Sequence, residues 1–342
     1  MSQQILFAPS VASVSDPNQW SMVSQGRIFE PAEGRIESLI DDIVAPLVGA
    51  DRTDPLFRAR VDYFVSDSIR GVRPSITLGN QVVQLAPSDP SGYFETNIPL
   101  TNDQVALLSR DGVITFESQS TPNSPARFPG SAVLVQEEGV IVVSDVDDTI
   151  KDTNVRNRDE AIANTLVRPF RPVVGMPEVY RAWKETSGAR VHFHIVSAGP
   201  WQFHEPLRRF TEDVGFPAFT WDMRSVDLAD PKALIAETVK PDPQRLFDFK
   251  VKKIRDLMTR FPRRHVVLVG DSGEKDPETY ATILSDSEFA DRVDAVLLHN
   301  VTGEGKDSKR YQNLYPTPEA AVKLRVFAHA SELPRRLGDA AN

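Results

Sequence analysis

Residues 145–149 bring together three carboxylates and a hydroxyl, at Asp145, Asp147, Asp148 and Thr149. They follow an apolar run, residues 141–143, that is typical of a buried strand. Asp145, placed first, can attack phosphorus, and Asp147 can give a proton to the leaving oxygen. A magnesium ion, which prefers oxygen ligands, would reduce the mutual repulsion of these groups and of a phosphate. The alternative interpretation is ordinary turn chemistry, with an Asp that caps the next helix.

Two later apolar runs also end in polar residues. RVHFHIVSAGPWQF, residues 190–203, reaches Ser197, and HVVLVGDSGEKDPETY, residues 265–280, reaches Asp271 and Asp276. In an open parallel sheet, ligands bind outside the carboxyl ends of the strands. We therefore expect these strand ends to converge on one site, which favours phosphoryl transfer over turn chemistry.

These motifs resemble those of the haloacid dehalogenase superfamily of phosphohydrolases. DVDDT is similar to its first motif, Ser197 to its second and GDSGEKD to its fourth. The longer phrases DVDDTIKDTNV, IVSAGPWQF and LVGDSGEKDPETY resemble the catalytic domain of the actin-patch phosphatidate phosphatase family of fungi and its bacterial relatives. The resemblance covers roughly residues 136–335 and is much more specific than the short DxDxT pattern.

The resemblance implies a role for each matched residue. Asp145 would be the nucleophile that forms an aspartyl-phosphate. Asp147 would protonate the leaving alcohol and later activate water, with Thr149 orienting it. Ser197 would donate a hydrogen bond to a phosphoryl oxygen. Positioning and charge stabilisation of this kind are most of what phosphoryl transfer requires from a protein.

The resemblance also implies a Mg²⁺ cofactor. Asp271 and Asp276 would hold the ion directly or through water, together with Asp145 and the backbone carbonyl of Asp147. The DxDxT pattern alternates its working side chains. We therefore expect Asp148 to point away from the metal.

A lysine that neutralises charge around the nucleophile forms the third motif of the superfamily. We favour Lys250, because it begins a predicted helix that leads into the fourth-motif strand and resembles the family's phenylalanine-lysine or histidine-lysine pair. A solvated helix face is the alternative for any lysine in this run. The competing candidates are Lys240, Lys252, Lys253 and Lys275.

The second part of the chain predicts an α/β fold, a Rossmannoid parallel sheet with helices on both faces, because strands alternate with helices from residue 140 onward. A helix is expected over 176–187, with Pro177 near its start and Gly188 at its end. Residues 151–175 leave room for a small cap only. The strands are expected at 191–196, 218–221, 266–269, 295–298 and 325–327.

The first part of the chain predicts a mainly antiparallel β-sandwich with a leading helix at 34–48. The expected strands are short runs separated by turn residues, at 57–65, 75–79, 81–86, 93–99 and 113–117. A Pro- and Ser-rich stretch, 120–131, is the best linker candidate. We therefore predict an N-terminal domain over 1–130 and a phosphatase domain over 131–342.

Composition limits the classes of function that the protein can have. The chain of 342 residues has 40% hydrophobic and 25% charged residues, which is typical of a globular protein with a substantial core. It contains no cysteine, which excludes thiol catalysis and thiolate metal sites. A net charge of −9 argues against nucleic-acid binding. Neither a secretory signal nor a membrane-spanning run is visible, so a cytoplasmic location is the default expectation, with peripheral membrane contact if the substrate is a lipid.

The sequence thus predicts a magnesium-dependent phosphatase acting on a phosphomonoester. Phosphatidate or a related lipid phosphate is the substrate that the resemblance implies. One alternative is a phosphatase for a soluble metabolite or a phosphoprotein. Another is a non-catalytic binding protein in which the N-terminal domain recruits a partner, whose identity the sequence does not give, and the phosphatase domain is vestigial.

Overall fold

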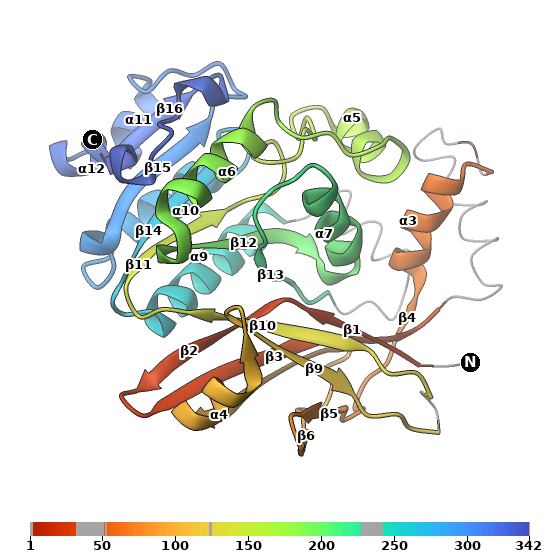
Figure 1. Cartoon of the computed structure of the whole chain (residues 1–342). Helices are drawn as coiled ribbons and strands as arrows, with labels where there is room; N and C mark the ends of the chain where they lie inside the picture. Colours follow the sequence, from red (N-terminus) through yellow and green to blue (C-terminus); the bar gives the residue numbers. More distant parts are fainter. Residues whose placement is uncertain (1–2, 32–50, 52, 123–124, 227–241, 342) are drawn as a thin grey trace. The chain divides into compact units, whose positions relative to one another are not determined.

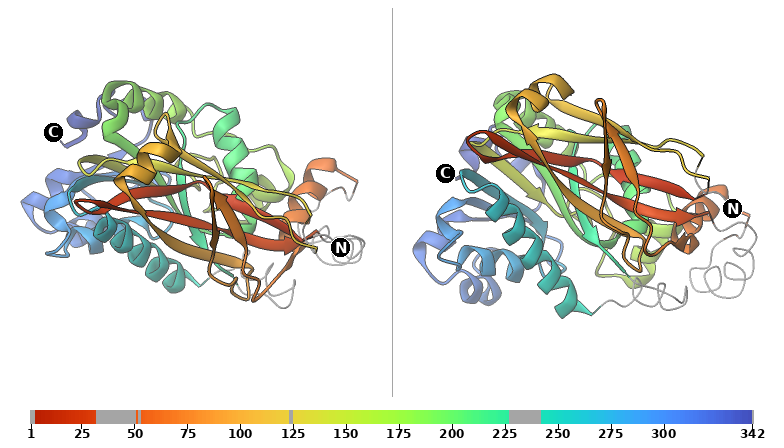
Figure 2. Two further views of the ribbon diagram at one scale, coloured as in Figure 1. Left: turned by 60° about the horizontal axis from the view of Figure 1, so that its bottom comes forward. Right: turned by 90° about the horizontal axis from the view of Figure 1, so that it is seen from below.

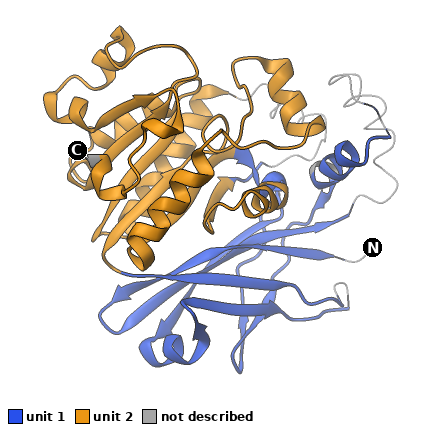
Figure 3. Ribbon diagram, turned by 45° about the horizontal axis from the view of Figure 1, so that its top comes forward, with its two compact units in different colours: residues 1–136, 199–204, 224–238 blue, residues 137–198, 205–223, 239–342 orange. Residues whose placement is uncertain are grey.

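The computed structural model describes residues 3–31, 51, 53–122, 125–226 and 242–341. The chain divides into two compact units, which Figure 3 colours separately. The first unit comprises 1–136 with 199–204 and 224–238, and the second comprises 137–198, 205–223 and 239–342. Each unit has its own sheet, mainly antiparallel in the first and parallel in the second. The predicted combination of an antiparallel β part with an α/β part is confirmed.

The first unit is built on one ten-stranded sheet, whose long strands can be followed in Figures 1 and 2. The main path runs β1-β3-β2-β10-β9-β5-β6, while β4 and β7 pair with β3 and β8 pairs with β9. Its strands are β1 Gln4–Ala8, β2 Ser10–Asp16, β3 Gln19–Glu30, β4 Asp67–Ser68, β5 Ser75–Leu78, β6 Gln81–Gln84, β7 Tyr93–Thr101, β8 Ser109–Arg110, β9 Val113–Ser118 and β10 Pro129–Val135. Its helices are α3 Pro55–Val65 and α4 Asn102–Leu108, with the short 3-10 turn η4 Trp201–Phe203.

Strands that are distant along this sheet share one hydrophobic core. The ring of Phe7 on β1 packs edge-on against Phe94 of β7 and against Phe116 of β9. Met22, Ile28, Ile76 and Ile114 are fully buried in the same cluster. Four of the predicted strands are present as β5, β6, β7 and β9. The segment 199–204 joins this unit through Trp201, whose ring stacks on Tyr93 at 5.2 Å between centroids.

The prediction of a strand at 57–65 is wrong, because this segment forms helix α3. The Asp54 carboxylate caps the helix by accepting hydrogen bonds from the amides of Leu56 and Phe57, and Pro55 occupies the first turn. Phe57 and Val61, four residues apart, are buried on one face. These local cap signals decide the structure over the alternating pattern.

The remaining differences between prediction and structure in the N-terminal part concern the leading helix, the first strands and the domain boundary. The leading helix predicted at 34–48 lies outside the described residues. Strands β1, β2 and β3 were not predicted. Strand β10 begins inside the predicted linker and pairs with β2 and β9, so the first unit extends to residue 136, whereas the predicted boundary followed residue 130.

The second unit is built on a six-stranded sheet in the order β13-β12-β11-β14-β15-β16. Its strands are β11 Gly139–Ser144, β12 Val191–Pro200, β13 Thr220–Arg224, β14 Arg264–Asp271, β15 Val293–His299 and β16 Leu324–Phe327. Its helices are α5 Arg158–Ile162, α6 Met176–Ser187, α7 His204–Asp213, α9 Pro243–Arg260, α10 Asp276–Leu284, α11 Lys309–Leu314 and α12 Pro318–Lys323. The shorter turns are η2 Ala163–Val167, η3 Gly188–Arg190, η5 Ala290–Arg292, η6 Ala330–Glu332 and η7 Leu337–Ala341.

Strand β11 lies at the centre of this sheet. Ile141, Val142 and Val143 are fully buried, as expected of β-branched residues in a strand covered on both faces. β11 pairs in parallel with β12 on one side and with β14 on the other. The chain therefore reverses its strand order around β11, which creates the crevice where open α/β sheets bind ligands. The first-motif strand thus lies between the strands that carry Ser197 and Asp271.

Helices cover both faces of the sheet. On one face, α6 places Tyr180 against Phe193 of β12, and the Tyr180 hydroxyl donates to the Ser144 hydroxyl oxygen at 2.8 Å. On the other face, Lys253 of α9 donates to the Asp222 carboxylate of β13 at 2.7 Å. Helix α6 has the bounds that the sequence predicted, from Pro177 near its start to Gly188 after its end.

The segment between β11 and α6 contains only the short helical turns α5 and η2, which agrees with a small cap. The stretch 229–245, which could add further covering, is described only from residue 242 onward. In the part of the chain that the structure describes, no helix is both long and apolar enough to cross a membrane.

The amino-terminal edge of this sheet is held by a buried arginine. The Arg264 guanidinium donates to the carbonyl oxygens of Glu138 at 2.8 Å, Val140 at 2.9 Å and Arg190 at 2.6 Å. Gly139 lies in the middle of these contacts with a φ of +123°, and a Cβ there would lie 2.1 Å from the Arg190 carbonyl oxygen. The entry of β11 into the sheet therefore requires glycine.

We expect Gly139→Ala to destabilise the protein by about 2 kcal/mol or more, because it adds both a steric clash and a disfavoured φ. Gly188→Ala is the matched control, since Gly188 also has a positive φ of +57° but its Cβ would meet no atom within 4 Å. Its cost should be smaller, because only the disfavoured backbone conformation opposes alanine there. Urea unfolding of both variants measures the difference, and equal costs would contradict the role of close packing at Gly139.

Candidate active site

The three polar strand ends of the second unit meet at the carboxyl edge of the sheet. The Asp145 amide, directly after β11, donates to the Val269 carbonyl of β14 at 2.9 Å. Asp271 ends β14, and Asp276 opens helix α10. All three aspartates are buried. The structure thus brings together residues that are more than a hundred positions apart in the sequence.

Asp145, Asp271 and Asp276 form a cluster suited to a metal ion. Each offers a carboxylate oxygen, and these oxygens lie within 4.8 Å of one another. Asp145 Oδ2 and Asp271 Oδ2 are buried and have no hydrogen-bond partner. Buried carboxylate oxygens without partners are costly, and hard cations such as Mg²⁺ satisfy them. The donor set therefore fits the predicted ion, although the side chain of Asp147 is not part of this cluster.

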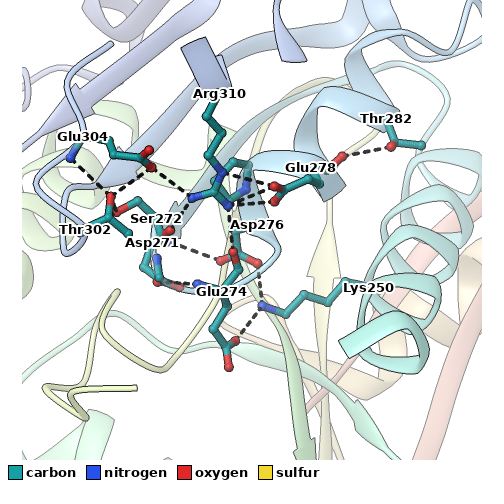
Figure 4. A network of polar contacts seen from close by, with 12 residues as sticks. Lys250, Asp271, Ser272, Glu274, Asp276, Glu278, Thr282, Thr302, Glu304 and Arg310 are labelled. Atoms are coloured by element: carbon teal, nitrogen blue, oxygen red, sulfur yellow. Dashed lines mark hydrogen bonds and ion pairs between the residues drawn. The ribbon is translucent and has the colours of Figure 1, made fainter. Parts of the chain in front are cut away.

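Lys250 provides the positive charge inside this cluster. It projects from α9, is 3% exposed, and places Nζ 3.0 Å from Asp145 Oδ1 and 2.5 Å from Asp276 Oδ1. A third carboxylate, Glu274, has its Oε2 at 3.7 Å from the same Nζ (Figure 4). The structure thus places the lysine favoured from the sequence beside the predicted nucleophile.

The loop between β14 and α10 fixes the fourth-motif carboxylates through its backbone. Asp271 Oδ1 accepts hydrogen bonds from the amides of Gly273 and Glu274, and the Asp271 amide donates to Asp276 Oδ2 at 3.3 Å. Gly270 allows this approach, because a Cβ at that position would lie 2.3 Å from Asp276 Oδ2. The loop therefore sets the orientation of the two carboxylates before any ligand binds.

Arg310 of α11 holds the outer side of the same loop. Its guanidinium donates to the Ser272 carbonyl at 2.7 Å and the Glu274 carbonyl at 3.1 Å, and it forms an ion pair with Glu278 at 2.9 Å. Figure 4 shows this network around Asp271 and Asp276. Arg310 thus pairs with Glu278 and stabilises the loop conformation.

The crowding of acids raises carboxyl pKa values. Burial is the main cause of the raised pKa of Asp145, and the neighbouring carboxylates of Asp276 and Glu274 add to it. Burial and Asp276 raise the pKa of Asp271 in the same way. Burial also raises the pKa of Glu274 to about 7, against the opposing effect of Lys250. The single ammonium does not balance the acids, so the cluster favours binding of a further cation.

Asp147 has a different environment from Asp145. Burial raises its pKa, but Lys151 and Thr153 outweigh that effect and leave the pKa lowered. Asp147 Oδ1 accepts hydrogen bonds from Lys151 Nζ at 2.8 Å and from the Thr153 hydroxyl at 2.5 Å. The prediction that Thr149 orients Asp147 is not met by this geometry, because the buried Thr149 hydroxyl has no hydrogen-bond partner. The orienting hydroxyl comes from Thr153.

Asp148 points away from the metal cluster, as the sequence predicted. Its carboxylate accepts hydrogen bonds from the amides of Thr153, Asn154 and Val155. Its backbone adopts a φ of +52°, and its carbonyl oxygen lies 2.6 Å from His299 Nδ1. Asp148 therefore has a structural role, in which it fixes the turn that returns Thr153 to Asp147.

Ser197 lies on β12, the strand beside β11. The two strands are paired up to Ser144 and Ile195, so Ser197 follows two residues beyond the last pair. Its side chain is 2% exposed. This placement at the same carboxyl edge agrees with the predicted contact to a phosphoryl group.

Fold and site together define a doubly wound α/β protein with an acidic site at the switch point of its parallel sheet. Residues 140–300 match the family model described as phosphatidate phosphatase APP1, catalytic domain. This part of the chain therefore matches the catalytic-domain family that the motifs predicted.

Two fungal proteins resemble the chain over a longer region. An uncharacterized protein of Schizosaccharomyces pombe is 25% identical over 69% of this chain and 38% of its own length. Phosphatidate phosphatase APP1 of Saccharomyces cerevisiae is 29% identical over 65% of this chain and 34% of its own length. The chain thus spans less than half the length of these curated relatives. Among solved structures, a β-glucuronidase of Parabacteroides merdae covers 86% of the chain and 35% of its own at 9% identity, with a TM-score of only 0.26.

Two residues of the site were missed from the sequence. Lys151 was not among the candidate lysines, although its position four residues after Asp147 brings it back to that carboxylate. Glu274 lies within the fourth motif, but the family pattern gave a role only to the aspartates around it. Its contact with Lys250 depends on the packing of α9 against α10.

Metal binding can be tested without measuring any reaction. We expect Mg²⁺ to raise the melting temperature of the wild type, with about 2.7 kcal/mol of stabilisation at a hundredfold excess over Kd. Asp271→Asn should remove most of that response. It should also leave the metal-free protein as stable as the wild type or more so, because it removes one of several buried like charges.

Asp291→Asn, a substitution in the turn before β15 and outside the cluster, is the control for this measurement. It should keep the full magnesium response. An unchanged response in Asp271→Asn, measured by differential scanning fluorimetry, would contradict the assignment of this residue as a ligand.

Proposed function

We propose that the protein is a magnesium-dependent phosphatase that hydrolyses a phosphomonoester, with phosphatidate or a related lipid phosphate as its substrate. The observation that carries this proposal is the arrangement at Asp145. Its carboxylate contacts Lys250 and lies within the same cluster as Asp271 and Asp276. A nucleophile, a cation-binding set and a fixed ammonium are the parts that phosphoryl transfer needs.

Asp145, Asp271 and Asp276 would hold the ion, since one carboxylate oxygen of each lies within 4.8 Å of the others, and Asp145 Oδ2 and Asp271 Oδ2 have no hydrogen-bond partner. When bound, Mg²⁺ supplies charge stabilisation at the phosphoryl oxygens. Lys250 supplies a second positive charge from the protein itself and holds Asp145 in place. Ser197, at the end of the neighbouring strand, donates a hydrogen bond from its hydroxyl to a phosphoryl oxygen.

In the first step, an oxygen of Asp145 attacks phosphorus as the bond between phosphorus and the leaving oxygen breaks. Asp147 gives its proton to that oxygen, so the alcohol leaves neutral and an aspartyl-phosphate remains. In the second step, water attacks phosphorus while Asp147 takes one of its protons, and the Asp145 carboxylate leaves. Phosphate departs, and both aspartates regain their starting states.

The substrate assignment rests on the family and on the activity named for the yeast relative. Phosphatidate is an amphipathic lipid that resides in membranes, so the protein would act in the cytoplasm at a membrane surface. The small segment between β11 and α6 leaves little folded structure to enclose a substrate. An open site is compatible with a headgroup presented by a bilayer.

Asp145→Asn should abolish phosphate release, because the amide is a poor nucleophile. The assay compares phosphatidate in detergent micelles with a soluble phosphomonoester, each with and without Mg²⁺. Asp152→Asn, an exposed carboxylate on the same loop, is the control and should keep wild-type activity. Residual turnover by Asp145→Asn at the wild-type rate would contradict its role as the nucleophile.

The same assay separates the alternatives. Equal turnover of both ester types by the wild type would favour a soluble substrate. No release from a broad panel of phosphoesters would favour the binding protein with a vestigial domain.

Lys151→Met should lower kcat about tenfold or more with little change in KM. The substitution releases the Asp147 side chain, which transfers a proton and does not bind substrate. Since Lys151 lowers the pKa of Asp147, its removal raises that pKa. The limb of the pH profile that reports Asp147 should therefore move to higher pH. An unshifted profile with normal kcat would show that Thr153 alone suffices to position this carboxylate.

A further inference from the structure

A cavity of about 500 Å³ lies beside the candidate site, between the start of α9 and the loop that precedes α10. Its lining divides into an apolar part and a charged part. The apolar part consists of Val155, Pro243, Leu246 and Phe247. None of these side chains has a role in the mechanism above.

The cavity and the nucleophile share one residue. Lys250 lines the cavity, and its ammonium is 3.0 Å from Asp145 Oδ1. Glu274 also lines the cavity, and its Oε2 lies 3.7 Å from the same ammonium (Figure 4). A group that is attached to a phosphoryl at Asp145 and extends past Lys250 would therefore enter this cavity.

The apolar wall is held in place by the surrounding structure. The Val155 amide donates to Asp148 Oδ2 at 2.7 Å, which anchors this residue to the first-motif turn. On α9, the Asp242 carboxylate caps the first turn, in which Leu246 and Phe247 are only half-buried. Apolar side chains left partly exposed around a concave surface are characteristic of ligand pockets.

Most of the charge in the charged wall is paired, and Lys275, which also lines the cavity, is exposed to solvent. Arg310 is paired with Glu278 at 2.9 Å, and Lys250 is surrounded by carboxylates. A second phosphate could contact Lys275, but an ion pair with an exposed lysine contributes little free energy. An alcohol with an apolar segment would bury Leu246 and Phe247 and would gain free energy from the hydrophobic effect.

We propose that this cavity binds the apolar part of the leaving alcohol that lies next to the phosphate. For phosphatidate, this part is the first methylenes of an acyl chain, and the remainder of the lipid stays outside. The volume lies within the range of pockets that bind small organic molecules. The inference rests on the proposed phosphatase function, and it assigns the preference for a lipid ester to Leu246 and Phe247.

The test compares kcat/KM for dioctanoyl phosphatidate in detergent micelles with kcat/KM for glycerol 3-phosphate. Leu246→Ser and Phe247→Ser should each lower the value for phosphatidate about tenfold, mainly through KM, because apolar contacts in a pocket contribute to discrimination at this level. The value for glycerol 3-phosphate should remain unchanged. Leu246→Trp, which fills the cavity, should also lower the value for phosphatidate.

Val322→Ser is the matched control, because Val322 is an exposed aliphatic residue of the same unit, 72% exposed and outside the cavity. It should leave both values unchanged. If the wild type hydrolyses phosphatidate and the three cavity variants retain its ratio of kcat/KM values, the inference is overturned while the phosphatase function stands. If the wild type hydrolyses glycerol 3-phosphate and not phosphatidate, the lipid assignment fails and the inference fails with it.

Discussion

The site depends on one electrostatic constraint, the burial of Lys250 among acids. Burial alone would lower the pKa of its ammonium, but the carboxylates of Asp145, Asp276 and Glu274 raise it instead. A lysine in this position remains charged only because α9, α10 and the end of β11 bring these acids to it. In turn, the acids tolerate their mutual repulsion only because the ammonium lies between them. Each partner makes the burial of the other possible.

That constraint explains the local architecture around the sheet edge. Asp276 can approach the end of β14 because Gly270 has no side chain, and Asp271 is turned by two backbone amides of the following loop. Arg310 then pairs with Glu278 and donates to two carbonyl oxygens of the same loop. The positive side chains of Lys250 and Arg310 therefore stabilise the acidic loop from its inner and outer sides. Among the residues that the structure describes, the buried carboxylate oxygens without hydrogen-bond partners belong to Asp145 and Asp271.

The sequence could predict those parts of the fold and site that are encoded locally or by pattern. Helix α6 carries its start and stop residues within its own sequence, and the strand ends follow from apolar runs that terminate in aspartate or serine. Helix α3 was missed, because an alternating pattern was given more weight than the cap of Asp54 and Pro55. Thr153 displaces Thr149 as the partner of Asp147 only because Asp148 folds the turn back. Contacts such as Glu274 with Lys250 depend on helix packing, which no short motif contains.

The two catalytic aspartates have opposite pKa shifts, which has a consequence for how the site becomes active. Without ligands, burial and neighbouring acids favour the protonated form of Asp145, whereas Lys151 and Thr153 favour the ionised form of Asp147. The proposed reaction needs the reverse, an ionised nucleophile and a protonated acid. A cation bound beside Asp145 lowers the pKa of that carboxyl, and a phosphate dianion near Asp147 raises the pKa of Asp147. Binding of a cation and a phosphate therefore shifts both pKa values in the direction that the proposed reaction needs.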